Sequence, residues 1–127
     1  MGAKGKVLVV DDDPDFVEVT RTILEAEGFE VISAANGDQG VEKMRTEHPD
    51  LVILDIMMSS VLDGVSVSQT MREDEDLRLL PLLMVSSITG SEFAEQFPTD
   101  EYMHVDDWLS KPVEPQELLK KVKSLIK

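Results

Sequence analysis

Short apolar runs alternate with longer amphipathic stretches along the chain. The runs expected to form strands cover residues 7–10, 30–34, 51–55, 82–85 and 108–110. Continuous apolar runs of this length are typical of strands that are buried on both faces of a parallel sheet. The alternation therefore predicts an α/β fold, doubly wound, in which right-handed crossovers place helices on both faces of a five-stranded parallel sheet.

The predicted helices begin and end at residues with capping preferences. Asp13 suits the N-cap, Pro14 suits the first helical position, and Gly28 suits the end of the same helix. A second helix follows Gly37 and stops before Pro49, because the residue preceding a proline disfavours helical backbone. Three further helices are expected at residues 65–72, 91–97 and 114–127.

Apolar side chains at helical spacing predict which face of each helix is buried. In the first helix this face is expected to consist of Phe16, Val19, Ile23 and Ala26. The corresponding positions are Val41 and Met44 in the second helix, Val67 and Met71 in the third, and Leu118, Val122 and Leu125 in the last.

The composition indicates one acidic globular domain. The 127 residues, 42% of them hydrophobic, suffice for a single core. No apolar run approaches the roughly 20 residues of a membrane span, and no cysteine is present for a disulfide or a thiolate metal site. The net charge of −14 argues against direct nucleic-acid binding. We expect a cytoplasmic protein without membrane contacts, with residues 1–5 disordered or tag-derived.

Carboxylates directly follow two of the predicted strands. Asp11, Asp12 and Asp13 come after the first strand, and Asp55 ends the third. Open parallel sheets bind ligands at the carboxyl ends of their strands, and in the flavodoxin-like order 2-1-3-4-5 the first and third strands are neighbours. We expect that order, which brings Asp11, Asp12 and Asp55 together. Like charges at such short range require a cation.

An oxygen-rich cluster of this kind favours Mg²⁺, which typically binds one or two carboxylates and retains several waters. Ser86, at the end of the fourth strand, and Lys111, after the fifth, add a hydroxyl and an ammonium at the same sheet edge. The charges of Mg²⁺ and Lys111 balance the three carboxylates. Such a site is suited to receive a phosphoryl group, with Asp55 as the nucleophile.

Taken together, these strand-end residues resemble the receiver domains of two-component response regulators, which are CheY-like proteins. The matching positions are Asp11-Asp12, Asp55, Ser86 and Lys111-Pro112, and the resemblance extends over essentially all of residues 1–127 as a single receiver domain. It implies that Asp55 accepts a phosphoryl group from a sensor histidine kinase or a phosphotransfer protein. The chain would then be a signalling switch that acts only on itself, and no turnover enzyme.

The resemblance also implies individual roles around the acceptor. Mg²⁺ would be bound by Asp12, by Asp55 and by the backbone carbonyl of Met57, with Asp11 acting through water. Lys111 would pair with the phosphoryl oxygens. A cis peptide bond would join it to Pro112, which is the residue that makes that conformation inexpensive. Two switch residues, Ser86 and Trp108, would respond to phosphorylation and alter the surface of the fourth helix, fifth strand and fifth helix for a downstream effector or a dimer.

Two other functions are compatible with parts of the sequence. A Mg²⁺-dependent phosphohydrolase with an Asp nucleophile usually has a second acid two residues later, where this chain has Met57. A phosphorylation-independent scaffold for protein–protein interaction is the main alternative. It is suggested by residues 57–64, which form a loop one residue longer than is usual in receivers and contain Ser59-Ser60 in place of the usual proline pattern.

Overall fold

The computed structural model describes residues 5–55, 67, 69–86, 107–110 and 113–126. Its centre is a five-stranded parallel sheet with the order β2-β1-β3-β4-β5, which confirms the predicted topology. The strands are β1 (Lys6–Val10), β2 (Glu30–Ala34), β3 (Leu51–Asp55), β4 (Leu82–Ser86) and β5 (Asp107–Ser110).

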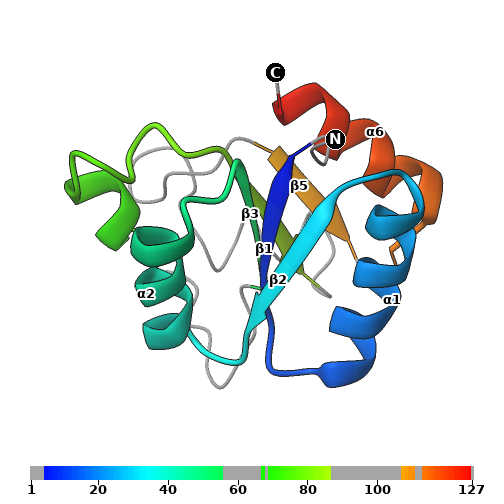
Figure 1. The fold of residues 1–127 in the computed structure, drawn as a ribbon, viewed down its shortest axis with the longest axis horizontal. Coiled ribbons are helices and arrows are strands. Elements are labelled where there is room, and N and C mark those ends of the chain that lie inside the picture. Colours follow the sequence, from blue (N-terminus) through cyan, green and yellow to red (C-terminus); the bar gives the residue numbers. More distant parts are fainter. Residues whose placement is uncertain (1–4, 56–66, 68, 87–106, 111–112, 127) are drawn as a thin grey trace, which may run out of the picture.

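Helices cover both faces of the sheet (Figure 1). The helices α1 (Pro14–Ala26) and α6 (Pro115–Leu125) lie on one face, and α2 (Gly37–Glu47) lies on the other. Residues 67 and 69–73 are also helical. The helix expected at residues 91–97 lies outside the described residues. No helix in the described part of the chain combines the length and apolar character needed to cross a membrane.

The side chains of the central strands form two separate cores, one on each face. In β1, Leu8 and Val10 pack in a cluster with Met44 of α2, whereas Val7 and Val9 pack in a cluster with Leu24 of α1. Alternate residues of a strand point to opposite faces, so a fully apolar strand serves both cores at once. All four β1 residues from 7 to 10 are 0% exposed.

The predicted buried face of α1 is confirmed for Phe16 and Ile23, which pack against the core that contains Leu24, and is wrong for Val19 and Ala26, which are exposed. Val19, expected in the core, is 56% exposed, and the buried residues of the helix are Thr20 and Leu24. The true stripe runs through Phe16, Thr20 and Leu24 at four-residue spacing. A threonine at its centre interrupts the apolar pattern, so the prediction included Val19 and missed Thr20. The predicted ends of α1 are confirmed: Asp13 is the N-cap and Gly28 follows the helix at φ 96°.

Gly40 lets α2 approach β1 closely at the strand end that leads to the carboxylates. A Cβ atom on Gly40 would lie 2.9 Å and 3.1 Å from the two Cγ atoms of Val10 and 3.6 Å from its Cβ. The first distance is below any ordinary carbon–carbon contact, so a larger residue requires the helix or the strand to move.

We therefore expect Gly40→Ala to destabilise the protein. Overpacking typically costs about 1–3 kcal/mol, and this exceeds or offsets the roughly 1 kcal/mol that alanine gains in helix propensity. Urea unfolding measures the change. In a Val10→Ala background the close Cγ contacts are gone, so there Gly40→Ala should be neutral or stabilising. Equal destabilisation in both backgrounds would show that this contact is not the cause.

Asp74 connects the segment before β4 to α2. Its Oδ1 accepts a hydrogen bond from the backbone N–H of Asp76 at 2.8 Å, and its Oδ2 accepts one from Arg45 at 2.5 Å. The Asp76 N–H, and after it the Arg45 side chain, hold the pKa of Asp74 below its ordinary value. Both interactions favour the charged carboxylate.

The lowered pKa gives Asp74 a pH-dependent share in stability. A carboxyl with a lower pKa in the folded state stabilises the protein above its unfolded-state pKa of about 3.9, and this contribution is lost as the pH falls through the folded-state value. We expect Asp74→Asn to lower the urea midpoint at pH 7 and to lower it less near pH 3. In an Arg45→Met background the effect at pH 7 should be smaller; an undiminished effect would exclude Arg45 as a contributor.

Candidate phosphoryl-acceptor site

Three carboxylates meet at the carboxyl ends of β1 and β3. These strands are neighbours, with Val10 paired to Leu54, so Asp11 and Asp55 both lie one residue beyond that pair. Oxygen atoms of Asp11, Asp12 and Asp55 all lie within 4.8 Å of one another. Asp11 is 2% exposed and Asp55 is 5% exposed, whereas Asp12 is exposed. The predicted cluster is confirmed in position, and two of its members are shielded from bulk water.

Local hydrogen bonds give the consecutive aspartates different tasks. The N–H of Asp11 donates to Ala34 of β2 at 3.1 Å, which continues the sheet by one residue. Its Oδ1 accepts from the N–H of Asp13 at 2.8 Å, and this bond fixes the carboxylate in place. Asp13 instead caps α1, because its Oδ1 accepts from the N–H of Asp15 at 3.0 Å. Asp12 is therefore the exposed member of the cluster.

The donor set fits a hard divalent cation. Three negative charges at this separation repel one another, and the low exposure of Asp11 and Asp55 strengthens that repulsion. Carboxylate oxygens are the ligands that Mg²⁺ prefers, and the exposed side of Asp12 leaves room for the waters that Mg²⁺ retains. The cluster could thus contribute direct and water-mediated ligands to one ion.

The remaining predicted site residues are placed only in part. Ser86 ends β4, one residue beyond Val85, which is paired with Asp55. Its backbone therefore lies at the same sheet edge as the carboxylates, while its side chain is outside the described part. Lys111 and Pro112 follow β5 directly, and they lie outside the described residues, as does Met57. Their roles and the cis peptide bond stay predictions.

Trp108 lies in β5, half-buried against the core that also contains Met84. Its backbone is held at both polar groups: the N–H donates to Asp107 Oδ1 at 2.8 Å, and the carbonyl accepts from Lys121 of α6. Lys121 also pairs with Asp107 at 3.3 Å. This arrangement could not be predicted from the sequence, because neither an apolar pattern nor a motif links Lys121 to β5.

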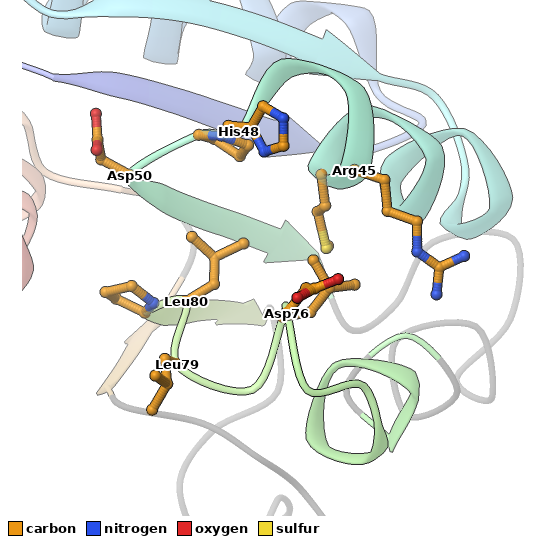
Figure 2. A pocket seen from close by; sticks show the side chains of 10 residues that line it. Arg45, His48, Asp50, Asp76, Leu79 and Leu80 are labelled. Carbon is orange, nitrogen blue, oxygen red and sulfur yellow. The ribbon is translucent and has the colours of Figure 1, made fainter.

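A separate pocket lies near the amino ends of β3 and β4, away from the carboxylates (Figure 2). It measures about 700 Å³ and is formed between the end of α2 and the segment that precedes β4. Asp50, which immediately precedes β3, lines it, whereas Asp55 ends that strand. The length of β3 therefore separates this pocket from the carboxylates. The side chains labelled in Figure 2 are Arg45, His48, Asp50, Asp76, Leu79 and Leu80.

Comparison with known proteins agrees with the fold. A family model described as the response regulator receiver domain matches residues 7–123. The chain belongs to the response regulator receiver family. Receiver domains are signalling domains that function in two-component systems, and this assignment covers nearly the whole chain.

Individual relatives lead to the same family. The receiver is 36% identical over 124 residues to a probable transcriptional regulator ycf27 of Cyanophora paradoxa, with 98% of this chain and 49% of the relative covered. It is 34% identical over 122 residues to the alkaline phosphatase synthesis transcriptional regulatory protein PhoP of Bacillus subtilis, with coverages of 96% and 48%. The chain thus spans about half the length of these curated relatives.

Among solved structures, the chemotaxis response regulator CheY4 of Vibrio cholerae superposes with a TM-score of 0.83 at 28% identity, covering 98% of this chain and 99% of that one. A signal receiver domain of a histidine kinase from Syntrophus aciditrophicus also gives a TM-score of 0.83, at 27% identity with coverages of 96% and 89%. Receivers in different protein contexts therefore share this fold.

We expect Mg²⁺ to determine which of two proteins, the wild type or Asp12→Asn, has the higher melting temperature. Without divalent cations, Asp12→Asn should melt at a higher temperature than the wild type, because it removes one of three repelling charges. With excess Mg²⁺ the wild type should melt higher, since binding to the folded state stabilises it. Thermal unfolding in EDTA and in Mg²⁺ measures both.

Asp13→Asn is the matched control, because asparagine also caps helices well and the charge change is the same. It should retain the Mg²⁺-dependent increase in melting temperature. An Asp12→Asn variant that gains as much from Mg²⁺ as the wild type would place the cation elsewhere.

Proposed function

We propose that this receiver is a phosphorylation-dependent signalling switch and that Asp55 is its phosphoryl acceptor. One observation carries the proposal: Asp55 ends the central strand β3 at 5% exposure, with oxygens of Asp11 and Asp12 within 4.8 Å. A cation bound by these three carboxylates would both neutralise and orient Asp55. The resemblance at Ser86 and Lys111 supports the same assignment.

The proposed step is transfer from a phosphohistidine. An oxygen of the Asp55 carboxylate attacks the phosphorus, the phosphorus–nitrogen bond breaks, and the imidazole of the donor leaves with the bonding electron pair. Asp55 then carries an acyl phosphate. Bound Mg²⁺ would supply charge neutralisation for the transferring oxygens. Asp12, Asp55 and the backbone carbonyl of Met57 would hold that ion, and Asp11 would act through water. Lys111 would pair with the phosphoryl oxygens.

The proposed partners follow from this step. The donor is a sensor histidine kinase or a phosphotransfer protein, and the readout occurs through Ser86 and Trp108 to an effector that the chain does not specify. Two relatives are named transcriptional regulators, so control of transcription through a further domain or partner is one form of that output. A phosphorylation-dependent dimer is another. We place this signalling in the cytoplasm.

The decisive test is intact mass after incubation with acetyl phosphate. We expect one phosphoryl addition to the wild type in Mg²⁺, none in EDTA and none in Asp55→Asn. Asp50→Asn is the matched control: it changes a carboxylate at the other end of β3, and its side-chain oxygen can still accept the bond from the N–H of Lys6 seen at 2.8 Å. Neutral hydroxylamine should remove the addition, as it does for acyl phosphates.

The opposite results are equally informative. An addition that persists in Asp55→Asn would assign another acceptor. No addition to a folded wild-type protein would favour the phosphorylation-independent scaffold, since residues 57–64, predicted to form a longer loop, closely follow Asp55 in the sequence.

A further inference from the structure

The outer edge of β2 carries backbone groups that β1 does not use. β2 is the first strand of the sheet and pairs only with β1 among the described strands. The N–H of Glu30 donates to Gly5 at 2.9 Å, and the carbonyl of Ala34 accepts from Asp11 at 3.1 Å. The even-numbered residues of β2 therefore face β1. Because alternate residues of a parallel strand bond to opposite sides, the odd-numbered residues present their N–H and C=O groups to the free edge.

Two cationic side chains bind the carbonyls on this free edge. Arg21 of α1 donates to the carbonyl of Val31 at 3.1 Å, and Lys43 of α2 donates to the carbonyl of Ser33 at 2.5 Å. Arg21 also lies 3.5 Å from the Ser33 hydroxyl. The two side chains come from helices on opposite faces of the sheet (Figure 1), so they close the edge from both sides.

We propose that Arg21 and Lys43 block the β2 edge against pairing with a second copy of this chain. The unblocked edge is complementary to itself. In an antiparallel pair with a two-fold axis at Ile32, Val31 lies opposite Ser33 of the second copy, and the two residues exchange N–H···O bonds on each side of the axis. Glu30 then lies opposite Ala34, so no like charges face each other. The two carbonyls that this pairing needs are those that Arg21 and Lys43 occupy.

The other edge strand has a similar feature. Lys121 of α6 donates to the carbonyl of Trp108 in β5. Long cationic side chains at sheet edges are a known means of preventing edge-to-edge association. Cationic side chains thus bind carbonyls of both edge strands, β2 and β5, which is consistent with a sheet that does not add strands from other molecules. Contacts with partners would then use other surfaces.

The test is the molar mass of the unphosphorylated double variant Arg21→Met/Lys43→Met. Methionine retains an unbranched apolar chain but has no N–H donor. Light scattering after size exclusion, over a series of protein concentrations, should show a concentration-dependent shift from the monomer mass to the dimer mass. The wild type should stay monomeric over the same series. In the dimer, hydrogen exchange at the amides of Val31 and Ser33 should slow.

The control double variant Arg78→Met/Lys120→Met removes the same two residue types at exposed positions away from β2, and it should stay monomeric. Adding Ser33→Pro to the blocked-edge variant should restore the monomer. The Ser33 N–H faces the free edge, so proline removes a donor for the second copy and none for β1.

A folded double variant that is monomeric throughout would overturn the proposal, as would a dimer that Ser33→Pro does not dissociate. Should this double variant fail to fold, the double variant Arg21→Ala/Lys43→Ala is measured in the same way, and a folded monomer with unchanged exchange at Val31 and Ser33 would also overturn the proposal. No phosphodonor is present, so these results are independent of the role of Asp55.

Discussion

The repulsion among Asp11, Asp12 and Asp55 is the constraint on which the rest of the structure depends. For the two buried carboxylates alone, Coulomb's law at an effective dielectric constant of about 20 gives roughly 3.5 kcal/mol at 4.8 Å, the largest separation between their oxygens. The buried apolar residues of β1, β3 and β4 supply the stabilisation that opposes this cost. A cation relieves the repulsion, whereas a phosphoryl group alone would increase it. Cation binding and phosphorylation should therefore favour each other.

The placement of the carboxylates follows from the two-sided burial of the sheet. Every side chain of β1 from residue 7 to 10 belongs to one core or the other, so an ionised group fits only where the strand ends. The consecutive aspartates at this strand end have different roles because they make different local hydrogen bonds. Asp11 is fixed by the N–H of Asp13, and Asp13 is committed to the helix cap. The same turn thus starts α1 and orients the site.

The sequence predicted the strands, their order and the carboxylate cluster, because unbroken apolar runs ending in Asp have few other interpretations in a parallel sheet. The prediction from the sequence failed where a polar residue is buried or an apolar residue is exposed. Thr20 is 1% exposed in the buried stripe of α1, whereas Val19 is 56% exposed. A pattern of apolar residues cannot predict that a threonine is buried and the neighbouring valine exposed. Long-range bonds were equally invisible, since those of Arg21, Lys43 and Lys121 to strand carbonyls depend on how the helices lie against the sheet edges.

Those bonds show how an acidic chain uses its few cations. The protein has 12 Lys and Arg residues against 26 Asp and Glu, yet three of the cations bind uncharged carbonyls of the edge strands. Surface ion pairs contribute little stability, because water screens them. A cation on an edge carbonyl satisfies a backbone acceptor and also occupies the position of an incoming strand. Excess negative charge discourages non-specific association over the whole surface. It does not satisfy the backbone carbonyls of an edge strand, which need a hydrogen-bond donor placed directly on them.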